Sequence, residues 1–119
     1  MSGENTALAD REARKTAYID RLLPFVPLHR VIARAVECLI ISDVELKQPS
    51  LDLGCGDGTF AYALGGGFAA GIDADPKIVR WATKHRSHGS LVVADARALP
   101  FRSGAFASVV CNSTLEHIP

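Results

Sequence analysis

Residues 51–60 read LDLGCGDGTF, and this stretch decides the fold. A short apolar run over residues 50–53 enters a turn that carries glycine at positions 54, 56 and 58. The pattern predicts a strand followed by a turn whose backbone can approach a ligand closely, because side chains at those positions would obstruct the approach. A helix is expected over residues 59–64, where three consecutive glycines end it.

The same alternation of strand and helix continues to the end of the chain. Three further strands are predicted, over residues 68–72, 91–94 and 105–111. Residues 87–90 are predicted to form a loop. Asp75 can cap a helix that has Pro76 at its first position. Apolar runs without alternation indicate strands buried on both faces, and intervening helices indicate parallel pairing. The expected fold is α/β, a Rossmann-like, doubly wound and mostly parallel sheet of which four strands are present.

Residues 1–48 precede this pattern and predict helices. Residues 1–12 are polar and small, so we expect a frayed lead-in, followed by a short helix over residues 13–23 that prolines end. The next apolar residues recur at helical spacing and predict an amphipathic helix with one buried stripe, formed by Leu28, Val31, Ile32, Ala35, Val36 and Leu39. The expected organisation is a lead-in with cap helices over 1–48 and a sheet domain over 49–119.

The composition excludes several classes of protein. Thirteen Lys and Arg residues balance thirteen Asp and Glu residues, so charge-driven binding of nucleic acid is not expected. The longest stretch without a charged residue, 58–72, is shorter than the roughly 20 apolar residues of a membrane span. The polar start of the chain also lacks the features of a secretory signal. These observations predict a cytoplasmic protein without a membrane partner.

The three cysteines, Cys38, Cys55 and Cys111, form no Cys-x-x-Cys pair. Their odd number and wide spacing argue against a disulfide framework and against a zinc cluster. We expect reduced thiols, of which Cys38 and Cys111 lie in apolar runs and pack as small hydrophobic residues.

Acidic side chains gather where the predicted strands end. All six acidic residues of 49–119 belong to these segments: Asp52, Asp57, Asp73, Asp75, Asp95 and Glu116. The basic residues of the same region lie on the predicted helix or in loops. Because ligands of doubly wound sheets bind outside the carboxyl ends of the strands, the expected cleft is acidic and suits a cationic ligand with sugar hydroxyls. Asp73, about twenty residues after the glycine turn, can accept both hydroxyls of a ribose.

Two other nucleotide-binding motifs fit the glycine turn less well. A dinucleotide fingerprint, Gly-x-Gly-x-x-Gly, would place its third glycine where the chain has Thr59, and here the glycine comes one residue early, at Gly58. A phosphate-binding P-loop would need Gly-Lys followed by Ser or Thr, which is absent. A dinucleotide-dependent oxidoreductase is kept as a lesser alternative.

Four segments of the chain resemble the class I S-adenosylmethionine-dependent methyltransferases, and most closely their small-molecule branch. The segments are LDLGCGDGTF at 51–60, GIDAD at 71–75, VVADARALPF at 92–101 and FASVVCNSTLEHIP at 106–119. Each lies at a predicted strand end, and their order is that of the family. The resemblance implies transfer of a methyl group from S-adenosylmethionine to an acceptor, expected to be a small molecule, with S-adenosylhomocysteine as the product.

The resemblance also implies which residues hold the methionine and ribose part of the cofactor. Gly54, Gly56 and Gly58 would line this part, and Cys55 lies between them. Asp52, two residues before the first of these glycines, would be close by.

The remaining cofactor contacts are expected from the later strand ends. By the resemblance, Asp73 would hold the ribose and Ala74 would touch the adenine. Asp95 would accept a hydrogen bond from the adenine amino group, with Ala96 flanking the ring. Asn112, after the fourth strand, completes the expected cofactor-binding set.

The acceptor side is defined by fewer residues. Asn112 stands where amide-methylating members carry Asn or Asp before Pro-Pro-aromatic, but Ser-Thr-Leu follows here, so base methylation is not expected. His117 could deprotonate an acceptor, since imidazole titrates near neutral pH; the alternative is an ordinary helical residue. Glu116 and His117 are similar to a segment of certain metal-dependent O-methyltransferases, but Asn112 and Ser113 replace the upstream acidic ligands, so no metal is expected.

Members of the family have a seven-stranded sheet, whereas four strands are predicted here. We therefore expect residues 49–119 to be the amino-terminal half of a methyltransferase domain and the chain to be a truncated form. The helices of 1–48 would, by the resemblance, cover the cofactor or acceptor pocket. An exposed fourth-strand edge could pair with another chain, and so the alternative is a non-catalytic cofactor-binding or interaction module that acts through self-association or a partner.

Overall fold

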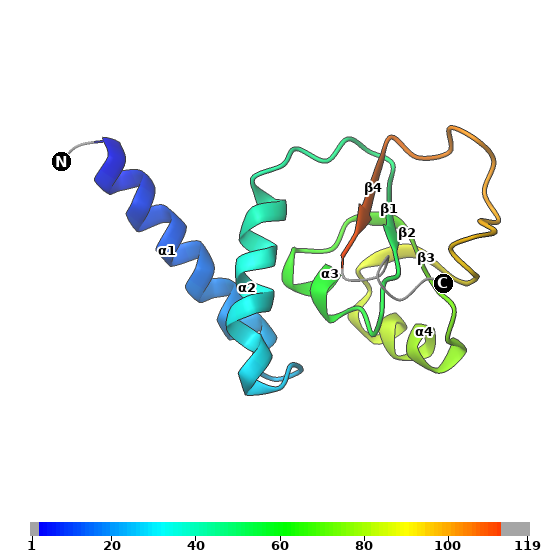
Figure 1. The fold of residues 1–119 in the computed structure, drawn as a ribbon, viewed down its shortest axis with the longest axis horizontal. Helices are drawn as coiled ribbons and strands as arrows, with labels where there is room; N and C mark the ends of the chain where they lie inside the picture. The colour runs from blue at the N-terminus through cyan, green and yellow to red at the C-terminus, as the bar shows by residue number, and fades with distance from the viewer. Residues whose placement is uncertain (1–2, 113–119) are drawn as a thin grey trace. The chain divides into compact units, whose positions relative to one another are not determined.

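The computed structural model describes residues 3–112 and divides the chain into two compact units, Met1–Glu45 and Leu46–Pro119 (Figure 1). The first unit is a pair of helices, α1 (Gly3–Leu22) and α2 (Leu28–Ser42). The second unit contains the sheet.

Helix α1 begins at Gly3, so the prediction of a frayed lead-in over residues 1–12 is wrong for residues 3–12. The polar residues of this stretch are compatible with a helix because they pair with each other along its exposed surface. Arg14 donates to Asp10 at 3.1 Å, and Lys15 lies 2.9 Å from Glu12. Such pairs, three or four residues apart, support a helix that has little apolar surface.

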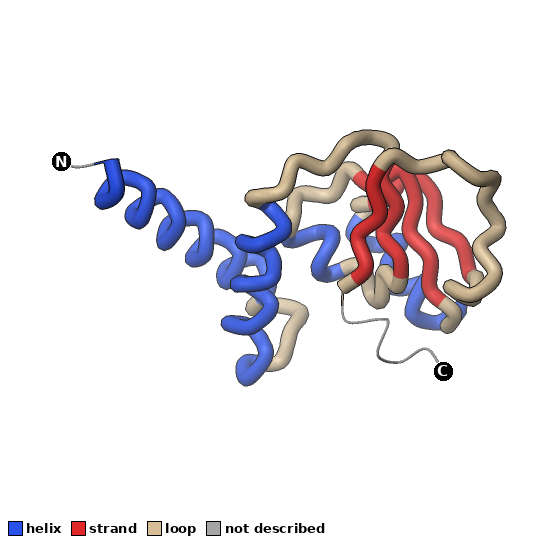
Figure 2. The backbone as a smooth tube through the Cα atoms, turned by 45° about the horizontal axis from the view of Figure 1, so that its top comes forward, coloured by secondary structure: helices blue, strands red, loops and turns tan. Residues whose placement is uncertain are grey.

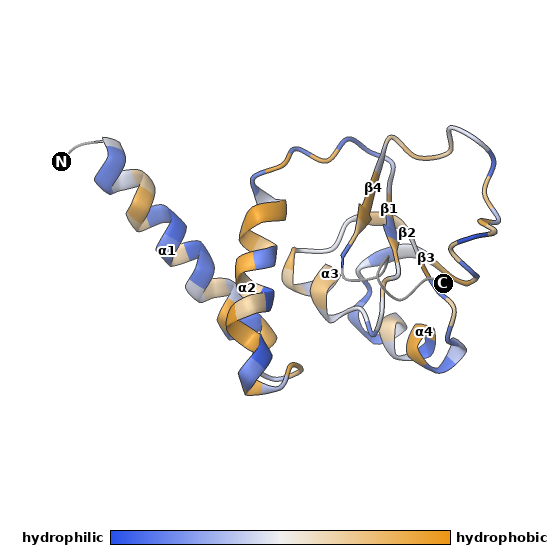
Figure 3. Cartoon of the chain, viewed as in Figure 1, coloured by the Kyte–Doolittle hydropathy of each residue, from blue (hydrophilic) through white to orange (hydrophobic). Residues whose placement is uncertain are grey.

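Helices α1 and α2 pack through a narrower stripe than the sequence predicts. The buried residues are Tyr18 and Leu22 of α1 with Val31, Ala35, Cys38 and Leu39 of α2. Leu28 and Ile32, which belong to the predicted stripe, are 79% and 66% exposed. In Figure 3 much of the α2 ribbon has the colour of hydrophobic residues, and several of these side chains stay exposed.

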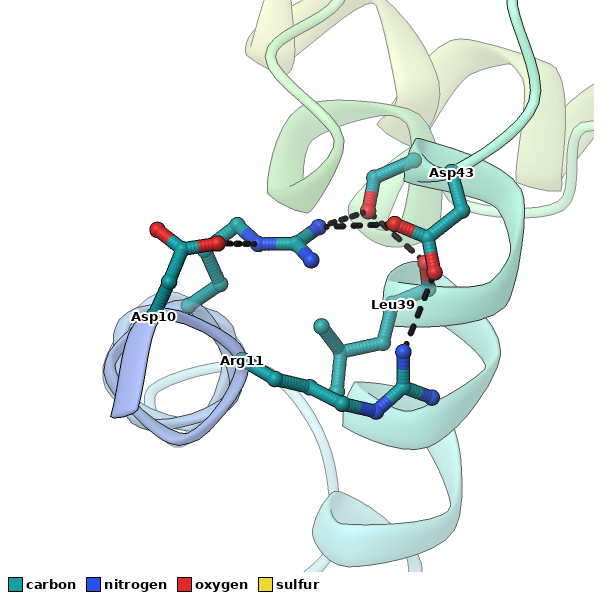
Figure 4. Close-up of polar contacts among 6 residues, drawn as sticks. Asp10, Arg11, Leu39 and Asp43 are labelled. Atoms are coloured by element: carbon teal, nitrogen blue, oxygen red, sulfur yellow. Dashed lines mark hydrogen bonds and ion pairs between the residues drawn. The ribbon is translucent and has the colours of Figure 1, made fainter. Parts of the chain in front are cut away.

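A polar network joins α1 to the end of α2 (Figure 4). The Arg14 guanidinium donates to Asp43 at 3.1 Å and to Ser42 at 3.0 Å, and it also contacts Asp10. Arg11 donates to the second oxygen of Asp43 at 3.0 Å. The hydrogen bonds from these two guanidinium groups, that of Arg14 first, hold the pKa of Asp43 below its ordinary value. These solvent-exposed charged contacts thus join the two helices beside their apolar stripe.

The sheet unit alternates strands and helices as predicted. Its elements are β1 (Ser50–Leu53), α3 (Thr59–Ala63), β2 (Phe68–Asp73), α4 (Pro76–Ala82), a short 3₁₀ helix η1 (Thr83–His85), β3 (His88–Val93) and β4 (Ser108–Cys111). All strand pairs are parallel, and the strands lie side by side in the order β3-β2-β1-β4 (Figure 2). The predicted Rossmann-like α/β fold with four strands is confirmed.

Two strands begin at other residues than predicted. Strand β3 starts at His88, inside the predicted loop 87–90, because His88 and Ser90 pair with Phe68 and Ala70 of β2. Pairing with a neighbouring strand overrides the weak strand propensity of this segment. Strand β4 starts at Ser108 rather than at 105. The expectation of burial on both faces holds for most of β1 and β2, whereas β3 carries exposed residues because it lies at an edge.

The order of the strands reverses beside β1. From β1 the chain moves outward to β2 and β3, and then it returns to place β4 on the other side of β1. One face of the sheet forms a core of Leu51, Ala70 and Ile72, against which the long connection before β4 packs with Phe101 and Phe106. Crevices for ligands form outside the carboxyl ends of strands at such a reversal. The glycine turn follows β1 directly and therefore lies at this point.

Candidate functional site

The glycine turn has a backbone that side chains would strain. Gly54, Gly56 and Gly58 have φ angles of 74°, 57° and 82°, which L-residues rarely adopt. A Cβ on Gly58 would lie 3.1 Å from the Cα of Ala82, so this glycine also lets the start of α3 approach α4. A Cβ on Gly56 would meet none of the described residues within 4 Å. Gly56 is thus the point where a ligand can approach the backbone.

Asp73 ties the glycine turn to the end of β2. One of its carboxylate oxygens accepts from the Gly56 N–H at 3.1 Å, and the other accepts from the Asp75 N–H at 3.1 Å. The Cys55 N–H adds a bond of 2.8 Å to the Ile72 carbonyl. A carboxylate offers about four lone-pair sites, so Asp73 retains acceptors for a ligand after these two bonds.

The third predicted segment lies next to Asp73. The Ala94 N–H donates to the Asp73 carbonyl at 3.0 Å, so the chain after β3 passes this residue. The Asp95 carboxylate is held by Arg97, whose guanidinium reaches one oxygen at 2.7 Å and the other at 3.0 Å. These bonds lower the pKa of Asp95 to about 2. The expected acidic cleft is therefore partly neutralised here. The role of Arg97 was not predicted, although the Asp-x-Arg turn was a signal for it in the sequence.

Removal of the Arg97 guanidinium should change the titration of Asp95. In Arg97→Ala we expect the pKa of Asp95 to rise from about 2 toward its ordinary value of 3.8, as followed by the carboxyl chemical shift in NMR. The lowered folded pKa means that the contact stabilises the fold above pH about 4 and that this contribution is lost as pH falls toward 2. An unchanged midpoint in the variant would show that the Asp95–Arg97 contact does not persist in solution.

Asp52 lies beneath the glycine turn rather than in the open. Its side chain is 6% exposed, and one carboxylate oxygen lies 2.8 Å from Nε2 of His88, a side chain that is wholly buried. The prediction for Asp52 was a place near the cofactor, whereas His88 was predicted only as part of a loop. No periodicity could have found His88, because its partner is thirty-six residues away.

The other predicted residues are distributed along the same edge of the sheet. Cys55 is buried, and burial raises the pKa of its thiol to about 12, so it stays protonated and inert at neutral pH. Ala74 is exposed and Ala96 half-buried. Asn112 comes directly after β4, the neighbour of β1. His117, the predicted catalytic base, lies outside the described residues.

A family model described as a methyltransferase domain matches residues 51–119. The chain belongs to this methyltransferase family. The match spans the four segments on which the resemblance to class I methyltransferases rests, and it confirms that prediction. A search of curated proteins gave no match to the chain.

No helix within residues 3–112 has both the length and the apolar character that crossing a membrane requires. Over the same residues, no three His, Cys, Asp or Glu side chains are grouped so that they could hold a metal ion.

Proposed function

We propose that this methyltransferase domain binds S-adenosylmethionine at the glycine turn and directs its methyl group to a small-molecule acceptor. The observation that carries the proposal is the bond between Asp73 and the Gly56 N–H. It places a carboxylate with spare acceptors beside open backbone at the point where the strand order reverses. A ribose hydroxyl pair and an adjoining cationic group match these features.

The charges at the site suit this cofactor better than a dinucleotide. Asp57 accepts from the Thr59 N–H at 3.0 Å, so a carboxylate occupies the first amide of α3. In dinucleotide-binding folds the corresponding helix start receives the pyrophosphate. A negative side chain there would repel phosphate, whereas it attracts the sulfonium and ammonium groups of S-adenosylmethionine.

The described residues would divide the binding between them. Gly54 and Gly56 would lie along the methionine and ribose part, and Asp73 would accept from the ribose. Asp95 would accept from the adenine amino group, while Ala74 and Ala96 would contact the ring. Asn112 would contribute from the end of β4. When bound, the cofactor supplies an electrophilic methyl group, and the protein supplies orientation and a polar environment for it.

His117 is proposed as the group that takes the proton of the acceptor. A neutral imidazole can accept a proton near pH 7, which suits an acceptor hydroxyl or amine that must lose one. The assignment rests on the sequence, in which His117 follows β4 and Asn112 at the edge of the sheet where the other proposed residues lie.

Calorimetric titration of the purified chain with S-adenosylhomocysteine tests the proposal directly. We expect saturable binding with one ligand per chain and weaker binding of NAD. Methyl-labelled S-adenosylmethionine, incubated with the chain and a panel of small hydroxyl, amine and thiol compounds, then reports transfer. Folded protein that does not bind S-adenosylhomocysteine, or that binds NAD more tightly, would contradict the proposal.

A further inference from the structure

A buried polar pair, formed by Asp52 and His88, lies under the glycine turn, and His88 has no part in the proposed contacts with the cofactor. Nε2 of His88 is 2.8 Å from the Asp52 carboxylate, and the exposed fractions of the two side chains are 0% and 6%. Because a carboxylate only accepts, Nε2 carries the hydrogen of this bond. The other ring nitrogen, Nδ1, is buried and has no hydrogen-bond partner among the described residues. The imidazole is therefore oriented by one polar contact alone.

The backbone of β2 makes room for this contact. His88 belongs to β3, which is separated from β1 by β2, so its side chain reaches over the intervening strand. It passes Gly71, where a Cβ would lie 2.6 Å from Cδ2 and 2.9 Å from Nε2 of the imidazole. Phe68 stacks on the imidazole ring, with centroids 5.7 Å apart. Gly71, which leaves room for the His88 ring, thus lies on β2 only two residues before Asp73, whose carboxylate holds the glycine turn.

Asp52 needs such a partner because it is a buried acid in a central strand. An unpaired carboxylate at this depth would be costly, and Asp52 pairs in register with Gly71, two residues before Asp73. Two residues after Asp52, the chain leaves β1 and turns at Gly54. The hydrogen bond from His88 consequently links β1 to β3 in the layer directly below the strand ends that form the site.

We infer that His88 is a positioning residue of the cofactor site, which holds the Asp52 carboxylate and thereby the start of the glycine turn. The inference rests on the proposed function where it concerns the cofactor. The hydrogen bond from His88 uses one carboxylate oxygen of Asp52 and leaves the lone pairs of the second oxygen for the cationic part of the ligand. His88 does not touch the ligand and acts through Asp52.

The test compares two substitutions of His88 with a control in the opposite face of the core. His88→Gln can place an amide donor near the position of Nε2, His88→Phe keeps a ring without the donor, and Phe106→Leu reduces packing away from the pair. Hydrogen exchange of the Cys55 and Gly56 amides, relative to amides of the β1–β2 ladder, measures the order of the turn without any ligand. Calorimetry with S-adenosylhomocysteine measures the affinity of the site for this ligand.

We expect exchange at both amides to be about 10-fold faster in His88→Phe, and the Kd for S-adenosylhomocysteine to be about 10-fold higher. His88→Gln should recover most of both losses, and Phe106→Leu should show neither. A His88→Phe protein that matches Phe106→Leu in exchange and in affinity would overturn the inference. If the unmodified chain binds no S-adenosylhomocysteine, the proposed function fails, and the exchange rates alone decide the role of His88.

A second comparison applies if His88→Phe does not fold. His88→Leu removes the donor with a smaller side chain than phenylalanine, and it is combined with Asp52→Leu, which removes the buried acceptor. If the two residues act as one unit, the faster exchange caused by His88→Leu should largely disappear in the Asp52→Leu background, which has no carboxylate to hold. Fully additive changes in exchange would overturn the inference.

Discussion

Replacement of Asp73 by alanine is expected to weaken the binding of S-adenosylhomocysteine by about 100-fold or more. Two hydrogen bonds from a ribose to a charged acceptor are worth about 3 kcal/mol together at the lower end of the usual range. The same substitution removes the acceptor of the Gly56 N–H, so the glycine turn loses a contact as well. Calorimetric titration of the variant beside the unmodified chain measures the loss.

Asp75→Ala provides the matched control for this experiment. Asp75 lies two residues further along and caps α4 by accepting from the Lys77 N–H at 2.9 Å. Its removal should cost about 1 kcal/mol of stability and leave the affinity for S-adenosylhomocysteine within about threefold, because no ribose contact is assigned to it. Equal losses of affinity in Asp73→Ala and Asp75→Ala would show that Asp73 acts only through local structure.

Gly71→Ala is expected to lower the free energy of unfolding of the sheet unit by about 3 kcal/mol or more. The added Cβ would lie 2.6 Å from the buried His88 ring and 3.0 Å from Leu91. The imidazole must then move, and the Asp52 carboxylate loses its partner inside the protein. Denaturant titration with fluorescence of Trp81 measures the change, since this residue is the one tryptophan of the chain and lies on α4 in the same unit.

Two further variants show whether the clash with His88 causes the loss of stability in Gly71→Ala. Gly104→Ala introduces the same methyl group at a glycine with φ of 75° and no described atom within 4 Å, and it should cost only about 1 kcal/mol. In a His88→Ala background, Gly71→Ala should add little, because the ring that it meets is gone. A full additional loss in that background would place the cause elsewhere in β2.

The fold was predictable because its signals are local. A glycine turn after an apolar run, and Asp75 with Pro76 at the start of a helix, each depend on neighbouring residues. The same locality explains the errors. Residues 3–12 show no apolar period and yet form a helix, and His88 looks like part of a loop and yet begins a strand. In the second case the deciding interaction is the pairing with β2.

The sequence allowed prediction of which strand ends form the candidate site, but not of how their side chains are paired. Parallel strands bring their carboxyl ends to one edge, so Asp73 and the glycine turn were expected together, and the structure joins them by the bond to Gly56. The partners of Asp95 and Asp52 were not expected. Arg97 bends back onto Asp95 within a turn, and His88 reaches Asp52 across β2. These contacts change how much negative charge the cleft offers.

The sequence by itself determined the α/β class, the family and the set of strand ends at which a ligand would bind. These properties follow from residue order, because short-range patterns of apolar residues and glycines specify strands, turns and their succession. Only the tertiary structure decided that Asp52 is paired beneath the turn and that Asp73 supports it from the side. Such contacts join residues far apart in the chain, and they depend on strand order, register and the space left by a missing side chain at Gly71.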